Sequence, residues 1–124
     1  ASITGIPDNY IENVTLSNIY VEYPGGGNRE DALKKLDELI DHYPESTMWG
    51  ILPSYGVFIR HAKYITMNNV RFNVIDNDKR PAIILDDVEG IIINDFETNN
   101  LGEKIKIENS SSLKGNFFNN KSEK

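Results

Sequence analysis

The sequence predicts an all-β protein built as a parallel β-helix, and three observations lead to this prediction. The segments Tyr55–Ala62 and Pro81–Val88 share one apolar motif, and the segments Tyr64–Val70 and Gly90–Phe96 share a second one, with Asn or Asp before an apolar residue. Both motifs recur after 26 residues (57 to 83, and 65 to 91), and self-similarity at such a period is typical of solenoid proteins. Apolar residues also alternate within each repeat, which indicates strands.

About four coils are expected along the chain. The first covers residues 2–23, and the others cover residues 51–76, 77–101 and 102–120, the last being a weaker copy at a spacing of about 22 residues (83 to 105, and 91 to 113). In the first coil, period-2 alternation predicts which side chains point into the interior and which point to the outside. The inward side chains are expected to be Ile11, Val14, Leu16, Ile19 and Val21, and the outward ones Thr15, Ser17 and Tyr20.

An insertion over residues 24–50 separates the first two coils. It begins with Pro24–Gly27, which breaks the strand pattern, and continues with a helix expected over residues 28–42. Asn28 is suited to cap the start of this helix, because its side chain can accept a hydrogen bond from the first turn. One apolar stripe at helical spacing predicts that the helix docks on the flank of the coils. The stripe consists of Ala32, Leu33, Leu36, Leu39 and Ile40.

The recurring Asn and Asp are expected to have a structural role. Asn18, Asn69 and Asp95 occupy the same position in successive coils, so that their side chains can bond to one another and to the turn backbone. This role is favoured over a catalytic one.

The two ends of the chain differ. The last residues, 119–124, form a polar tail, whereas Ile3, Ile6 and Ile11 enter a full-strength coil at once. Because a solenoid coil buries its faces only by stacking, we expect the N-terminal end to pack on preceding coils or to self-associate.

Composition excludes several classes of function. The 124 residues carry a net charge of -6 with a pI near 4.8, which argues against a nucleic-acid partner. No apolar run approaches the roughly 18 residues that span a bilayer, so no membrane partner is expected. The absence of cysteine excludes disulfides and thiolate metal sites, and neither a cofactor nor a metal is expected.

Several segments resemble, in a consistent order, the C-terminal region of bacterial glycoside hydrolase family 28. They are residues 3–7, 11–19, 23–27, 44–50, 52–56, 60–61, 69–72 and 80–83. The resemblance implies a right-handed parallel β-helix of the pectin-lyase-like type and a polygalacturonase-like enzyme that hydrolyses galacturonic-acid-containing polysaccharide with inversion. It also implies a periplasmic or extracellular location. The catalytic signatures of the family (Asn-Thr-Asp, Asp-Asp, Gly-His-Gly and Arg-Ile-Lys) precede the region that this chain resembles, so no catalytic residue is expected here.

Four residues are candidates for binding a uronate-containing saccharide. Arg60 and His61 follow a strand and are expected on the rim of the coils, where an arginine can grip a uronate carboxylate bidentately. Trp49 and Tyr55 offer rings that can stack on a sugar. In the alternative interpretation, the two aromatic residues pack the insertion on the coils and Arg60 pairs with Asp86.

Two other arrangements of acids have weaker support. Asp86 and Asp87 could serve an inverting glycosidase, but adjacent strand residues point to opposite faces and do not converge. A calcium site would need six or more oxygens, which clustered acids alone do not establish. The acids that could contribute are Asp76, Asp78, Asp86 and Asp87.

Two functions remain open from the sequence. The first is the C-terminal part of a glycoside hydrolase acting on pectin-type polysaccharide, with the catalytic motifs outside this chain. The second is a stand-alone, non-catalytic β-helical module that binds carbohydrate or serves a structural role.

Overall fold

The computed structural model describes residues 1–33, 35 and 52–118, and in these residues the protein is mostly strand. The strands pair with one another in parallel in one sheet, which confirms the all-β prediction. In chain order the elements are β1 (Ser2–Thr4), β2 (Ile11–Gly25), α1 (Arg29–Ala32), β3 (Val57–Asp76), β4 (Ile83–Glu97), β5 (Ile105–Glu108) and β6 (Ser111–Lys114).

The register of the sheet reproduces the period of the sequence. Ile65 of β3 lies opposite Ile91 of β4, and Ile91 lies opposite Leu113 of β6, so that each residue faces its counterpart in the next repeat. Val14 of β2 lies opposite Ile65, although these two are further apart in the chain because the insertion lies between them. Equivalent positions of successive repeats are therefore neighbours in space.

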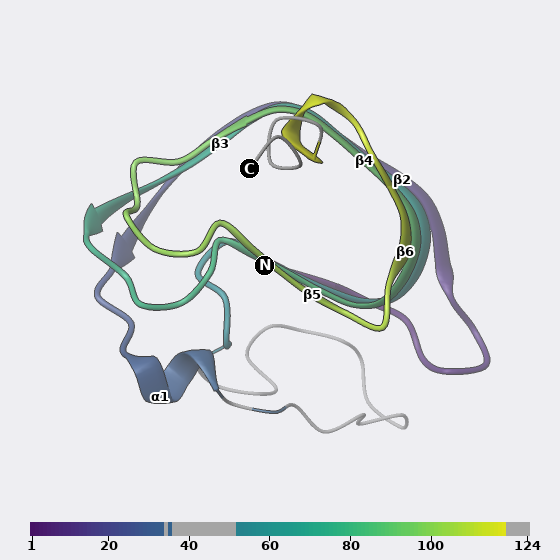
Figure 1. Cartoon of the computed structure of the whole chain (residues 1–124), viewed down its shortest axis with the longest axis horizontal. Coiled ribbons are helices and arrows are strands. Elements are labelled where there is room, and N and C mark those ends of the chain that lie inside the picture. The colour runs from purple at the N-terminus through teal and green to yellow at the C-terminus, as the bar shows by residue number, and fades with distance from the viewer. Residues whose placement is uncertain (34, 36–51, 119–124) are drawn as a thin grey trace.

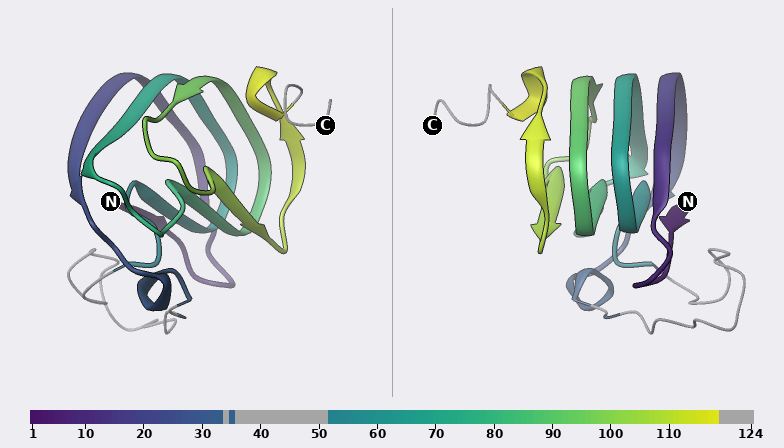
Figure 2. Two further views of the ribbon diagram at one scale, coloured as in Figure 1. Left: turned by 60° about the vertical axis from the view of Figure 1, so that its left-hand side comes forward. Right: turned by 90° about the vertical axis from the view of Figure 1, so that its right-hand side faces the viewer.

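The long strands curve around a shared interior. Viewed along the stacking direction, β2, β3, β4 and β6 follow nearly the same path (Figure 1). From the side, these passes of the chain lie next to one another in order, with the N-terminus at one end and the C-terminus at the other (Figure 2). Each repeat therefore contacts mainly the repeats next to it.

Residues with positive φ bend the strands at matching positions. Asn18, Asn69 and Asp95 have φ angles of 56°, 55° and 57°, a backbone region that Asn and Asp tolerate better than other side chains. The bend interrupts the period-2 alternation, so that Met67 and Val70 are both buried although they lie three residues apart. Backbone conformation therefore explains why Asn or Asp precedes an apolar residue in each repeat.

The side chains of these residues are also bonded across the strands. The Asn69 side-chain amide donates to Asn18 Oδ1 at 2.9 Å, and the Asn116 amide donates to Asp95 Oδ1 at 2.9 Å. The predicted bonding between repeats is thus found between Asn18 and Asn69, and Asp95 bonds to Asn116 of the following repeat.

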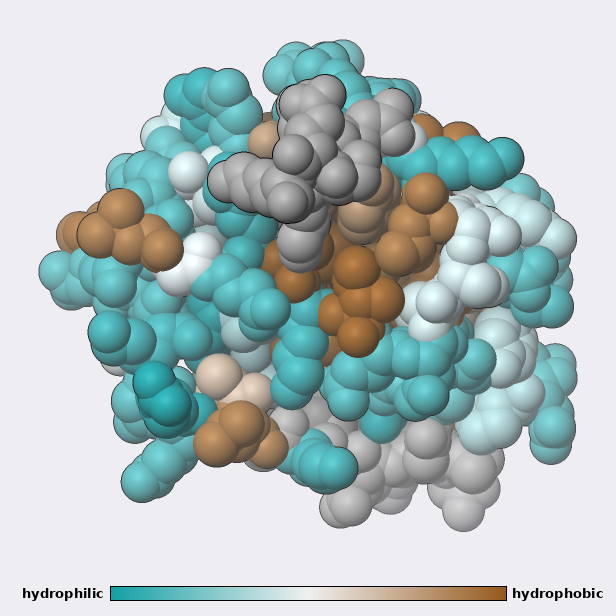
Figure 3. Space-filling model, viewed as in Figure 1, coloured by the Kyte–Doolittle hydropathy of each residue, from teal (hydrophilic) through white to brown (hydrophobic). Residues whose placement is uncertain are grey.

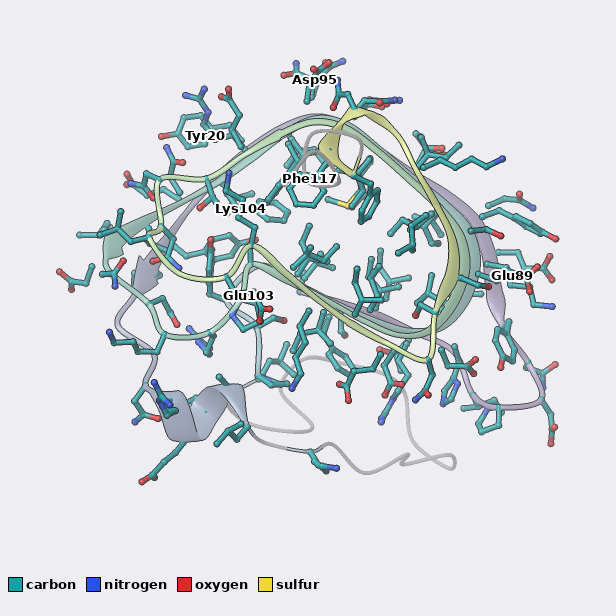
Figure 4. All side chains as sticks on the ribbon, viewed as in Figure 1. Tyr20, Glu89, Asp95, Glu103, Lys104 and Phe117 are labelled. Atoms are coloured by element: carbon teal, nitrogen blue, oxygen red, sulfur yellow. The ribbon has the colours of Figure 1, made fainter. Side chains whose placement is uncertain are left out.

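The core fills the interior that the curved strands enclose. Its centre is made of fully buried Ile, Leu, Val and Met side chains, and a row of aromatic rings crosses the repeats. Phe72 contacts Phe96 edge-to-face at 5.5 Å between centroids, and Phe96 contacts Phe117 at 5.9 Å. Phe117 lies in a short helical segment, residues 116–118, and points into the interior near the C-terminal end (Figure 4).

Burial of the core is less complete towards the ends of the stack. At the C-terminal end, a hydrophobic area lies near the middle of the molecule and hydrophilic residues surround it (Figure 3). At the other end, the predicted inward residues of β2 are only half-buried, although they pack on the core. The central repeats, β3 and β4, therefore supply the most deeply buried side chains.

Helix α1 is shorter than the sequence predicts. Asn28 caps it, because the Asn28 side chain accepts from the Asp31 N–H and the Asp31 carboxylate accepts from the Asn28 N–H. The helix ends at Ala32, Leu33 is 66% exposed, and Lys35 is not helical, so the prediction that residues 33 and 35 belong to the helix is wrong. None of the α1 residues is buried, and a short helix without tertiary packing is only marginally stable. The remainder of the expected helix lies outside the described residues.

Candidate functional site

A cleft lies on the outer face of the sheet, between the beginnings of β3 and β4, strand β5 and the insertion. It has a volume of about 260 Å³. Ala32, Leu33 and Lys35 border it on the side of the insertion, with Pro53 where the insertion returns to the coils. On the side of the sheet it is lined by Phe58, Arg60, Ile84, Asp86, Lys106 and Glu108.

The strand register builds the sheet side of the cleft. Side chains two residues apart on a strand share a face, so Phe58 and Arg60 project to the same side of β3. One row of side chains across the strands consists of Phe58, Ile84 and Lys106, each opposite the next in the register. Phe58 and Ile84 in this row are buried and apolar. The second row is charged and consists of Arg60, Asp86 and Glu108.

The charges of the cleft favour an anion. Three cations (Lys35, Arg60 and Lys106) and two carboxylates (Asp86 and Glu108) give a net charge of +1 in a chain whose net charge is -6. The Lys106 amine lies 4.0 Å from the Glu108 carboxylate, and Arg60 lies opposite Asp86 in the register.

Arg60 lines this cleft and is nearly buried. It is only 5% exposed, and its guanidinium carbon lies 5.3 Å from the centroid of the Phe58 ring, a cation–π contact. Because ordering a long side chain costs conformational entropy, an arginine that is already fixed loses less on binding. The structure therefore brings Arg60, of the four predicted residues, into a cleft suited to a carboxylate.

Tyr55 lies in the core and is not among the residues of the cleft. It is 5% exposed, its hydroxyl lies 2.7 Å from Thr98 Oγ1, and its ring contacts the edge of Tyr23 at 5.9 Å. Burial raises the pKa of the Tyr55 phenol above its ordinary value. Trp49 lies outside the described residues.

His61 belongs to a different cluster, with Tyr10 and Asp87. Its Nδ1 lies 2.7 Å from Asp87 Oδ2, and the Tyr10 hydroxyl donates to the same carboxylate oxygen. His61 and Asp87 are equivalent residues of successive repeats, both at positive φ. Burial opposes the charge of Asp87, but the hydrogen bonds from Tyr10 and His61 hold the pKa of that carboxyl below its usual value. Sequence reasoning missed this cluster, although the repeat spacing that relates His61 to Asp87 was a usable signal.

The paired acids do not form one site. Asp86 lines the cleft, whereas Asp87 bonds to His61 and Tyr10. Asp78 is fully buried and bonded to Arg80, away from both. Within residues 1–33, 35 and 52–118, no three acids and histidines come close enough to hold one metal ion.

No protein-family model, curated protein or solved structure matches this chain. The helices in the described part of the chain include none that is both long and apolar enough to cross a membrane.

Proposed function

We propose that this chain is a right-handed parallel β-helix of about four coils, and that these coils form the C-terminal part of a polygalacturonase-like glycoside hydrolase. The parallel pairing of equivalent residues in successive repeats supports the architecture. The ordered resemblance of residues 3–96 to the C-terminal region of glycoside hydrolase family 28 supports the class of enzyme.

In this proposal the cleft contributes to binding a galacturonic-acid-containing polysaccharide. The observation that carries it is a cationic cleft in an acidic chain, with Arg60 nearly buried at its base. Arg60 would grip a uronate carboxylate, Lys106 would add a second positive charge, and Phe58 and Ile84 would contact the apolar face of a sugar ring.

Catalysis would belong to residues outside this chain. Inverting glycosidases need two carboxyl groups roughly 6.5–9.5 Å apart, one as the acid and one as the base for a water molecule. The two carboxylates of this cleft each have a cation opposite or beside them, since Asp86 lies opposite Arg60 in the register and Glu108 is close to Lys106. We expect the isolated chain to release no reducing ends from polygalacturonic acid.

Titration calorimetry with hexagalacturonate and with its fully methyl-esterified form tests the binding. The ester removes the negative charges and keeps the sugar chain, so only the acid should bind well. Lys106→Gln should weaken binding about tenfold, equivalent to ~1.4 kcal/mol, and Arg60→Gln should weaken it further. Lys114→Gln, at an exposed cation outside the cleft, is the matched control. Equal binding of the acid and the ester, or no effect of either cleft variant, would reject this role.

A stand-alone, non-catalytic module is the second candidate. The partial burial of the apolar β2 side chains favours the first candidate, because these residues would be covered by preceding coils or by self-association. The intact mass of the native protein separates the two. A mass several times the 14.1 kDa of this chain supports the enzyme, whereas a mass near that value supports the module. The enzyme proposal also places the protein in the periplasm or outside the bacterial cell, which fractionation of the source cells can test.

A further inference from the structure

A polar groove crosses three strands on the wall opposite the cleft. It has a volume of about 380 Å³, within the ~300–1,000 Å³ range of small-molecule sites. Tyr20 and Asp95, which belong to it, point outward from the upper wall in Figure 4. Strand β5, which contributes Lys106 and Glu108 to the cleft, runs along the lower wall in Figure 1. The groove is therefore separate from the proposed uronate cleft and does not rest on it.

Two rows of side chains form the sides of this groove. One row contains the positive-φ residues Asn18, Asn69 and Asp95, and the other contains their strand neighbours two positions on, Tyr20, Arg71 and Glu97. Because equivalent residues are adjacent in the parallel register, both rows run along the stacking direction. The space between them is thus linear and suits an extended chain.

The side chains of the groove are held in place before any ligand binds. Asn69 donates to Asn18 at 2.9 Å, Arg71 forms an ion pair with Glu97, and the Asn73 amide donates to the Tyr20 hydroxyl at 3.4 Å. A site ordered in advance loses little conformational entropy when it binds a ligand. Each amide also has further donor or acceptor capacity after one such bond.

The chemistry of the groove selects a neutral ligand with many hydroxyl groups. One cation (Arg71) and two carboxylates (Asp95 and Glu97) give a net charge of -1, which disfavours a polyuronate or a nucleic acid. Amides both donate hydrogen bonds to hydroxyl groups and accept them, whereas carboxylates only accept them. Tyr20, 63% exposed, offers an aromatic face to the apolar side of a sugar ring. Six of the eight residues that line the groove have polar side chains, and the other two are Ile19 and Val70.

We propose that this groove is a second saccharide site, which takes a neutral oligosaccharide lying along the stacking direction with one sugar ring on Tyr20. The protein would then hold neutral glycan on one wall and uronate on the other. Such an arrangement suits a mixed polysaccharide, in which charged and neutral chains occur together.

Binding of neutral hexasaccharides tests the proposal. Cellohexaose, xylohexaose and mannohexaose are titrated into the whole chain, with chemical-shift changes of the protein as the readout, and at least one is expected to bind and shift resonances of β2, β3 and β4. Tyr20→Ala should weaken that binding at least about tenfold, and Tyr20→Phe should retain it because the ring remains. Tyr64→Ala is the matched control, since Tyr64 is also an exposed tyrosine (50%) but lies outside the groove.

The comparison with hexagalacturonate keeps the two sites distinguishable. Tyr20→Ala should leave hexagalacturonate binding unchanged, and hexagalacturonate should not displace the neutral ligand. The inference is overturned if none of the three hexasaccharides binds, if Tyr20→Ala binds as tightly as the unmodified chain, or if hexagalacturonate competes for the same resonances. Each of these results leaves the test of the uronate cleft unaffected.

Discussion

The carboxylate of Asp78 is fully buried and is bonded on both oxygens by the guanidinium of Arg80. Arg80 Nε donates to Oδ1 at 2.9 Å and Nη2 donates to Oδ2 at 2.7 Å. The same turn holds both ends of the insertion, because Arg80 Nη1 donates to the Leu52 carbonyl at 3.1 Å and the Lys79 N–H donates to the Gly27 carbonyl at 2.9 Å. The turn between β3 and β4 therefore ties Gly27, at the start of the insertion, and Leu52, just after it, to one place on the sheet.

Removing one partner of this pair should destabilise the fold strongly. In Asp78→Asn the Arg80 charge stays largely buried without its counter-charge, and breaking a buried pair in this way typically costs about 3–5 kcal/mol. Urea denaturation measures the loss. Glu97→Gln is the control, because the Arg71–Glu97 pair is exposed and should contribute at most ~1 kcal/mol. Equal stability of the two variants would contradict the buried-pair argument.

Positive φ at Asn69 gives a second prediction. Asn69→Ala places a side chain that disfavours this backbone region at φ 55° and removes the bond to Asn18, so we expect a loss of about 1–2 kcal/mol. Asn69→Gly loses the same bond but adopts this conformation readily, and it should be the more stable of the two. Denaturation of both variants under one set of conditions measures which of them is more stable. If alanine is tolerated as well as glycine, the side-chain bond and not the backbone explains the asparagine.

Two neighbouring isoleucines of β4 allow a direct test of core burial. Ile91 is fully buried between Ile65 and Leu113, whereas Ile92 is 38% exposed on the outer face. Ile91→Ala should cost about 2–5 kcal/mol because it leaves a cavity, and Ile92→Ala should cost much less. Thermal unfolding of the two variants provides the comparison. Similar losses would mean that the alternation at this point of β4 differs from the one described.

The period of the sequence was sufficient to place the strands but not all of the side chains. The repeat spacing determined which residues pair, because Ile65 and Ile91 must be neighbours if the repeats stack in register. Side-chain direction was harder to predict, because residues with positive φ interrupt the alternation. His61 is one of these residues, and its side chain joins Asp87 whereas the Arg60 side chain lines the cleft.

Contacts between residues that are distant in the chain are the second feature that could not be predicted from the sequence. Tyr10 donates to Asp87, 77 residues away, and no local pattern indicates that pairing. The burial of Tyr55 depends on Tyr23 and Thr98, which come from two other repeats. The end of α1 at Ala32 could not be predicted from its apolar stripe, because helical spacing shows which face of a helix is apolar but not where the helix ends.

Acid should weaken the fold partly through Asp87. The hydrogen bonds from Tyr10 and His61 hold the pKa of Asp87 in the folded protein below the value of about 3.9 expected in the unfolded chain. The unfolded state therefore binds a proton first as the pH falls. The stabilisation is present above about pH 4 and is lost as the pH falls through the folded pKa.

Asp87→Asn should consequently lower stability at neutral pH and reduce its decline between about pH 5 and pH 3. Part of the decline should remain, because the Arg80 hydrogen bonds outweigh burial and also lower the pKa of Asp78, which titrates in the same direction. Tyr10→Phe removes one of the two side-chain donors to Asp87 and should give an intermediate slope. Urea denaturation at a series of pH values measures the three slopes. If Asp87→Asn keeps the slope of the unmodified chain, the Tyr10–His61–Asp87 cluster does not contribute to acid sensitivity.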